Sequence, residues 1–172
     1  MAEIDDREVV EVQIGRPLRA ASEVVARCHL GMPVVIRVPP HLDDGTPFPT
    51  LYWLTCPLAV TRIGRLEGAG GVKRLEARAA ADPEFGARLE RAHASYASER
   101  EALIENDDVP RPSGGVGGSG TGVKCLHAHY AHTAAGGDNP VGQLVASWID
   151  PLDCDVPCVV GDDMNPEWVN KP

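Results

Sequence analysis

A short run in the last third of the chain holds more groups able to ligate a metal, or to act as nucleophile and base, than any other part. Between residues 122 and 132 it places one thiol and three imidazoles, at Cys125, His127, His129 and His132. Thiolate and imidazole are preferred zinc ligands, and a thiol beside an imidazole is also the pair used in thiol catalysis. The run therefore indicates where chemistry would take place, and it does not identify the reaction.

Helical spacing decides which of these groups face one another. At about 100° per residue, Cys125 and His132 lie almost in line on a helix, and His129 is within reach of both. His127 points away from them. A metal site on a single helix needs further ligands from elsewhere in the chain.

Two cysteines in the first third of the chain, Cys28 and Cys56, are the natural suppliers of such ligands. Both lie where a strand or a turn is expected to meet a helix. Cys56 precedes Pro57, a residue that suits the first position of a helix, and the helix dipole favours a thiolate at that end.

Two other interpretations of these residues remain open. Cys125 can be a small buried apolar residue while the histidines are hydrogen-bonded or exposed. In an enzyme, Cys125 or Cys56 would be the nucleophile with His127 or His132 as base, or a metal with one open position would activate water. The chain has no nucleophile elbow and no His-Glu-x-x-His motif. An iron–sulfur cluster is less favoured because the cysteine spacing fits none of the standard runs.

Two further motifs have weaker support. The glycine-rich stretch 114–122 precedes Lys124, but it lacks the Gly-Lys-Ser/Thr order of a phosphate-binding loop and no strand comes before it. We therefore expect a plain linker there rather than a site for a small anion. Cys154 and Cys158 form a Cys-x3-Cys pair in an acidic tail, without a second pair at matching spacing, and we expect no role for them.

Composition and charge exclude several classes of partner. The chain has 172 residues and a formal net charge of −9, with a pI of about 5.0, which argues against a nucleic-acid binder. No apolar stretch approaches the roughly 18 residues that span a bilayer, and the acidic N-terminus lacks the order of a signal peptide. We therefore expect a cytoplasmic protein without membrane contact. Five cysteines beside six histidines favour free thiols or metal ligation over disulfides.

The order of elements predicts one α+β domain over residues 1–150, in which helices pack a small N-terminal sheet, and an irregular acidic tail over residues 151–172. β-Branched runs predict strands at residues 8–14, 34–38 and 50–55, the last two forming a pair. Apolar periodicity and cap residues predict helices at residues 18–27, from 57, from 83 to about 105, at 123–135 and from 140. We expect residues 108–122, rich in Gly and Pro, to form a flexible loop.

Several stretches together resemble DUF501, a family of actinobacterial proteins of unknown function. The most specific one is Asp44-Gly-Thr-Pro-Phe-Pro-Thr-Leu-Tyr-Trp-Leu-Thr-Cys-Pro57. The others are Gly15-Arg-Pro17, Cys28 with Gly31-x-Pro33, Arg65-Leu-Glu67, and Val123-Lys-Cys-Leu-His127 with Ala131-His132. The resemblance spans about residues 13–142 and implies no established activity. Its pattern singles out Cys28, Cys56, Cys125, His127 and His132.

The resemblance and the residues together lead to one functional hypothesis and one alternative. We expect an accessory protein that acts through a protein partner and is held together by one Zn²⁺ or similar ion. The ligands of this ion would be Cys28, Cys56, Cys125 and His132. Such an ion would add stability to a core with few aromatic residues. The alternative is a metal- or thiol-dependent, hydrolase-like enzyme that uses Cys125 or Cys56 with His127 or His132.

Overall fold

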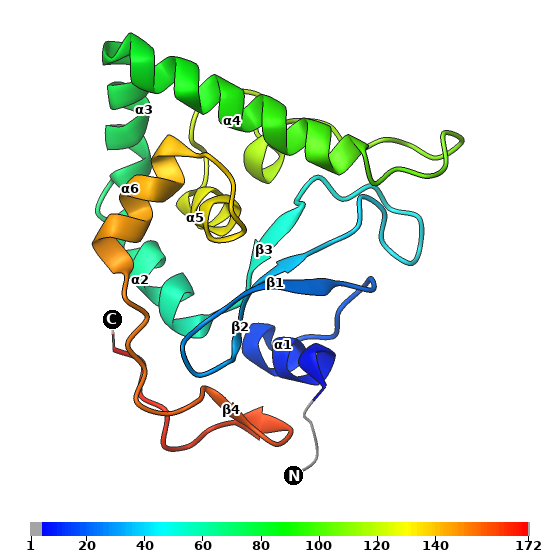
Figure 1. The fold of residues 1–172 in the computed structure, drawn as a ribbon, viewed down its shortest axis with the longest axis vertical. Coiled ribbons are helices and arrows are strands. Elements are labelled where there is room, and N and C mark those ends of the chain that lie inside the picture. Colours follow the sequence, from blue (N-terminus) through cyan, green and yellow to red (C-terminus); the bar gives the residue numbers. More distant parts are fainter. Residues whose placement is uncertain (1–4, 172) are drawn as a thin grey trace.

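A three-stranded antiparallel sheet lies in the middle of the molecule, with helices on both of its faces (Figure 1). The computed structural model describes residues 5–171. The strands are β1 (Glu23–Arg27), β2 (Pro33–Arg37) and β3 (Tyr52–Leu54), in the order β1-β2-β3. Val35 of β2 lies opposite Leu54 of β3. The structure therefore confirms the predicted strands at 34–38 and 50–55, their pairing, and the α+β class.

The two faces of β2 support different parts of the core. Val35 packs into the main core, whereas its neighbour Ile36 packs with Val10 in a second cluster. Successive side chains of a strand point to opposite faces of the sheet, so β2 is covered on both sides. Helix α1 (Asp6–Ile14) covers one face and α5 (Leu126–Ala134) lies against the other (Figure 1).

The strand predicted at residues 8–14 is wrong, because this segment is helix α1. The carboxylate of Asp5 accepts a hydrogen bond from the Arg7 amide, and Gly15 ends the helix in a left-handed conformation at φ 68°. Val9 and Val10 lie on the buried side. A residue that caps each end and an apolar face that packs on the sheet outweigh the weak β preference of the valines.

The helix predicted at residues 18–27 is also wrong. Leu18 and Ala20 belong to an irregular segment, and residues from Glu23 onward form β1. Val24 lies opposite Ile36 of β2. Pairing with the buried strand β2 outweighs the apolar spacing that suggests a helix. The apolar side chains of this segment pack in the sheet instead.

The other predicted helices are present, and most begin at the expected residues. They are α2 (Pro57–Gly68), α4 (Pro83–Glu101), α5 and α6 (Pro140–Ile149), to which the structure adds α3 (Gly71–Ala81). The Asp82 carboxylate accepts from the amides of Glu84 and Phe85, and the Asn139 side chain accepts from the Gly142 amide. These caps are local in sequence, so the sequence alone can predict where the helices start.

Helix α5 is the most enclosed of the helices. It lies between the sheet, α6 and the long α4 (Figure 1), and its Leu126 and Ala131 are fully buried. Because Cys125 directly precedes α5 and the three histidines lie on it, the position of α5 determines where these four residues lie.

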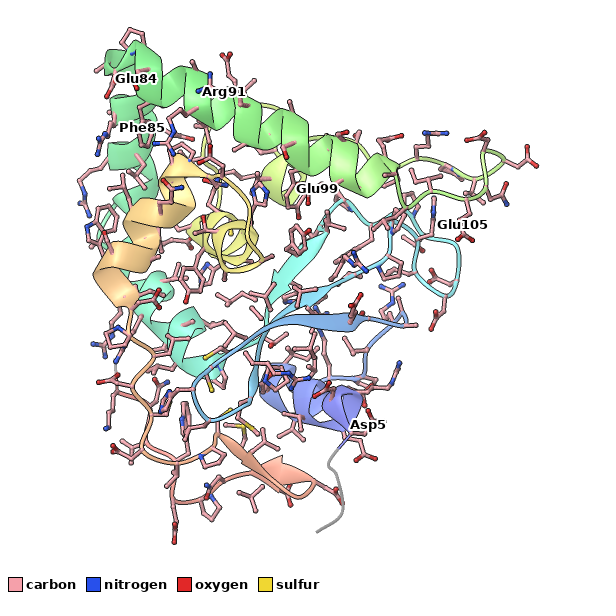
Figure 2. All side chains as sticks on the ribbon, viewed as in Figure 1. Asp5, Glu84, Phe85, Arg91, Glu99 and Glu105 are labelled. Carbon is pink, nitrogen blue, oxygen red and sulfur yellow. The ribbon has the colours of Figure 1, made fainter. Side chains whose placement is uncertain are left out.

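Helix α4 contacts both α3 and the sheet. Figure 2 shows Phe85 at the start of α4, near α3, and Glu99 further along α4, beside the sheet. Glu99 accepts a hydrogen bond from the Tyr52 hydroxyl at 2.8 Å.

The segment expected to be a flexible linker is closely packed over residues 114–119. Val116 is 1% exposed and contacts Leu51 and Tyr96. The backbone of Gly115 passes so close to α4 that a Cβ atom there would lie 2.4 Å from His93 Nδ1. The glycines in this part of the loop therefore permit a close approach to α4.

The tail folds back against α1. Its short strands β4 (Val159–Val160) and β5 (Asp163–Met164) pair with each other, and Cys158 and Val159 pack with Val9. In the part of the chain that the structure describes, no helix combines the length and the hydrophobicity that a membrane crossing needs.

A pair of glycine substitutions distinguishes a packed loop from a free linker. We expect Gly115→Ala to lower the free energy of unfolding by about 1–3 kcal/mol, because the added methyl group collides with His93. Gly120→Ala is the matched control, since nothing lies within 4 Å of a Cβ at that position. Urea unfolding of both variants measures the difference. Equal stabilities would contradict the packed loop.

Candidate functional site

The four predicted zinc ligands do not come together in the structure. Cys125 precedes α5 and lies beside α2, whereas His132 is fully buried in the core. Cys28 and Cys56 lie together elsewhere, along a small cavity at the tail. The predicted four-ligand site is therefore not formed.

The physical reason lies in the backbone at the start of α5. Cys125 has an extended conformation, φ −145° and ψ 117°, and only the next residue begins the helix. A spacing rule of about 100° per residue therefore does not apply to Cys125. Its thiol turns toward His127, the imidazole that the helical rule directs away from it.

A different group of ligand atoms does converge. Among the residues that the structure describes, one set of three ligand atoms lies within 4.8 Å of one another, from Glu67, Cys125 and His127. His127 Nδ1 is 3.2 Å from Glu67 Oε1 and 3.9 Å from Cys125 Sγ. Helix α2 supplies the carboxylate near its C-terminal end, and the start of α5 supplies the thiol and the imidazole.

The fold fixes each member of this group independently. Glu67 Oε1 accepts a hydrogen bond of 2.6 Å from the amide of Leu126, one of the N–H groups that a helix start leaves without a partner. His127 Nε2 lies 3.1 Å from the carbonyl oxygen of Val60. Lys124 has a left-handed backbone at φ 56°, a conformation that costs a non-glycine residue energy, and it turns the chain into Cys125.

The imidazole of His127 faces hydrogen-bond acceptors at both nitrogens. The Val60 carbonyl can only accept, so Nε2 carries a proton, and the carboxylate of Glu67 faces Nδ1. Burial lowers the pKa of His127, but the hydrogen bond with Cys125, the charge of Glu67 and the Val60 carbonyl together raise it to about 9. A cation, either a proton or a metal ion, is therefore favoured at Nδ1.

A cavity of about 470 Å³ opens beside the group, and Cys125 and His127 form part of its wall. The rest of the wall is mostly apolar, with Phe48 and Trp53 at a ring-centroid distance of 5.7 Å. The guanidinium of Arg16 lies 4.7 Å from the centre of the Trp53 ring. The thiol and the imidazole are thus accessible to a ligand with an apolar portion.

The other two histidines of the run are core residues. The ring of His129 contacts the side chain of Asn139 through Nδ1 and the Val123 carbonyl through Nε2, at 2.9 Å. Burial lowers the pKa of His129 to about 4, so the ring is neutral at physiological pH. The alternative interpretation, in which the histidines of this run are hydrogen-bonded and bind no metal, predicts these contacts of His129.

His132 lies between two tyrosines. Its ring stacks on Tyr52, with the centroids 5.9 Å apart, and meets Tyr96 edge to face at 5.2 Å. Burial lowers the pKa of His132 as well. The nearest carboxylate oxygen, of Glu99, is 3.9 Å from Nε2. The residue fills space in the core between α5, β3 and α4.

Sequence reasoning missed Glu67. A search for closely spaced cysteines and histidines does not find a carboxylate that lies about 60 residues earlier and meets them only after folding. The one available signal was the stretch Arg65-Leu-Glu67 within the family resemblance.

Comparison with known proteins supports that resemblance. A family model described as "Protein of unknown function (DUF501)" matches residues 24–147. None of the curated proteins and none of the solved structures matches the chain. Glu67, Cys125 and His127 lie inside the matched range, whereas Cys154 and Cys158 follow it. Because the match covers well over half of the sequence, the chain belongs to the DUF501 family.

Proposed function

We propose that the protein binds one divalent transition-metal ion, Zn²⁺ in the first place, through Glu67, Cys125 and His127. The observation that carries the proposal is the environment of His127 Nδ1. A thiol sulfur and a carboxylate oxygen lie close to this ring nitrogen, while the other ring nitrogen, Nε2, is hydrogen-bonded to the Val60 carbonyl. A cation bound between these three electron-pair donors would be stabilised by all of them. Thiolate, imidazole and carboxylate are the ligand types that zinc takes in proteins.

The distances are close to those of a tetrahedral zinc site. Zinc lies about 2.3 Å from sulfur and about 2.0–2.1 Å from nitrogen or oxygen, so tetrahedral angles place sulfur and nitrogen about 3.6 Å apart, and nitrogen and oxygen about 3.4 Å apart. The corresponding separations from His127 Nδ1 are 3.9 Å to Cys125 and 3.2 Å to Glu67. For these two separations, movements of a few tenths of an ångström would reach the tetrahedral values.

The neighbouring groups also suit a metal site. A metal-bound histidine commonly donates its other N–H to a carbonyl or carboxylate, which fixes the tautomer and the ring orientation. The Val60 carbonyl is placed for this role at His127 Nε2, and the Leu126 amide orients Glu67. The Val60 carbonyl leaves His127 Nδ1 free, and Glu67 Oε1 would bind the ion through the lone pair that does not accept from the Leu126 amide.

Three protein ligands leave a fourth position open, as in zinc sites that bind an outside group. The wall of that position is the apolar cavity beside Cys125. We propose that a side chain of a partner protein enters this cavity, in keeping with the accessory role expected from the sequence. An apolar side chain would contact Phe48 and Trp53, and a donor atom on the partner would complete the ligand set.

Enzymatic thiol chemistry is a second candidate, favoured by the distance of 3.9 Å between Cys125 Sγ and His127 Nδ1. An imidazolium stabilises a neighbouring thiolate, and a helix start adds to the effect. Glu67 would orient the imidazole as the third member of the group. In that case the protein would not retain zinc, and iodoacetamide would modify Cys125 at neutral pH more slowly in His127→Gln than in the wild type.

Metal analysis of purified variants tests the metal proposal. We expect the wild type to keep one zinc equivalent at this site after dialysis, and Cys125→Ser, His127→Ala and Glu67→Gln each to lose it. Glu67→Gln retains an oxygen for the Leu126 amide and removes only the charge. His41→Ala is the matched control, because the ring of His41 bonds the Pro110 carbonyl far from this group. Equal zinc content in all four variants and the wild type would overturn the proposal.

The pH dependence of stability tests the pairing of His127 without a metal. Its pKa rises from 6.5 to about 9 on folding, so the folded chain binds the proton more tightly than the unfolded chain. The resulting stabilisation is complete below about pH 6.5 and is lost as the pH rises through 9, and it is worth at most about 3 kcal/mol.

We expect the difference in free energy of unfolding between the wild type and His127→Gln, measured with a chelator, to fall between pH 6 and pH 9.5, because the other groups that titrate in this range are common to both proteins. Added Zn²⁺ should reverse the sign, because the ion displaces a proton and binds better as the pH rises. Urea unfolding at several pH values measures both effects. A difference between the two proteins that does not change with pH would contradict the contacts of His127.

A further inference from the structure

Four of the five cysteines line one small cavity, at the opposite end of α2 from Glu67. They are Cys28 from the turn after β1, Cys56 from the residue before α2, and Cys154 and Cys158 from the tail. Figure 2 shows sulfur atoms gathered between the start of α2 and the tail. The cavity measures about 10 Å³, roughly the room that one water molecule or one ion requires.

Two of the four sulfurs accept hydrogen bonds from side-chain N–H groups. Gln13 Nε2 donates to Cys158 Sγ at 3.4 Å, and the indole N–H of Trp168 donates to Cys154 Sγ at 3.3 Å. A neutral thiol is a weak acceptor, whereas a metal-bound thiolate is stabilised by such donors.

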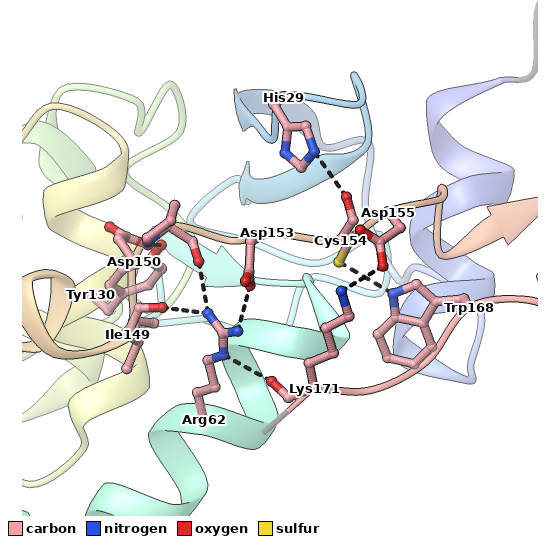
Figure 3. A network of polar contacts seen from close by, with 11 residues as sticks. His29, Arg62, Tyr130, Ile149, Asp150, Asp153, Cys154, Asp155, Trp168 and Lys171 are labelled. Atoms are coloured by element: carbon pink, nitrogen blue, oxygen red, sulfur yellow. Dashed lines mark hydrogen bonds and ion pairs between the residues drawn. The ribbon is translucent and has the colours of Figure 1, made fainter.

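The tail residues that carry two of the thiols are held in place by a polar network (Figure 3). Arg62 of α2 donates to the carbonyls of Ile149 and Pro151 at 2.7 and 2.8 Å, and pairs with Asp153 at 2.6 Å. His29 Nε2 lies 2.9 Å from the carbonyl oxygen of Cys154. The Cys-x3-Cys pair of the tail thus has a second pair beside it in space, although not in sequence.

We propose that Cys28, Cys56, Cys154 and Cys158 form a second metal site, which takes one Zn²⁺ as a four-thiolate ion. Binding releases the thiol protons, and the N–H donors offset the negative charge of the resulting complex. No three of the four sulfurs lie within 4.8 Å of one another in the structure, so the proposal requires these side chains to turn inward as the ion binds. The ion would tie the tail to the sheet and to α2, and this site does not depend on the Glu67 group.

Alkylation mapping of the full chain tests the proposal. The reduced protein, loaded with Zn²⁺ or treated with a chelator, is reacted with iodoacetamide, and the modified cysteines are identified by mass spectrometry. We expect Zn²⁺ to protect all four cysteines and the chelator to expose them. Cys125→Ser is the matched control and should leave this protection unchanged, which separates the two metal proposals.

Two variants exclude simple burial as the cause of protection. Cys158→Ser should leave Cys28 unprotected in the presence of Zn²⁺, although Cys28 itself is unchanged. Trp168→Phe keeps an aromatic ring and removes the N–H donor to Cys154, so we expect zinc affinity at this site to fall by about tenfold to a hundredfold while the fold is retained. A Trp168→Phe variant with wild-type affinity would remove the role of that donor and count against the site.

Three results would overturn the proposal. The first is equal alkylation of the four cysteines with Zn²⁺ and with chelator. The second is protection that disappears in Cys125→Ser. The third is a disulfide between Cys154 and Cys158 in protein purified without reductant, because it would remove two of the four ligands.

Discussion

The hydrogen bond between the Leu126 amide and the Glu67 carboxylate is the contact on which the candidate site depends. Helix α5 begins in the interior, where Leu126 is fully buried and the side chain of Cys125 makes no cap. An unsatisfied amide at such a place costs about 1–3 kcal/mol. Helix α2 provides the missing acceptor at 2.6 Å. The need to cap a buried helix therefore places a carboxylate beside His127, whether or not a metal is bound.

The three imidazoles of the run differ because α5 has neighbours on several sides. His129 and His132 face the core, where burial lowers the pKa of both rings and keeps them neutral. His127 faces α2 and has a carboxylate and a thiol as neighbours, and its pKa is raised. The same residue type in one helix thus provides two core residues and one imidazole that lies beside a carboxylate and a thiol.

The sequence predicted the parts of the fold that local signals determine. Pro57, the Asp82 cap and the Asn139 cap lie next to the helices that they start, and those helices are present. The conformations of residues 8–14 and 18–27 depend on what packs against them, so local preference gave the wrong element in both. The site follows the same division. The predicted metal site included Cys125 but took His132 in place of His127, because helical spacing was applied to a residue that precedes the helix. Glu67 and the partners of Cys28 are set by the folded topology.

Helix α2 explains why one ion cannot join the residues that the sequence suggested. Cys56 precedes its first residue and Glu67 is its penultimate one, a separation of about 16 Å between Cα atoms at 1.5 Å per residue. Cys125 lies at the Glu67 end and Cys28 at the Cys56 end. A zinc–sulfur bond is only about 2.3 Å long. The same helix therefore keeps apart two groups of ligands, one beside the apolar cavity and one beneath the tail, and each has its own set of N–H or carbonyl partners.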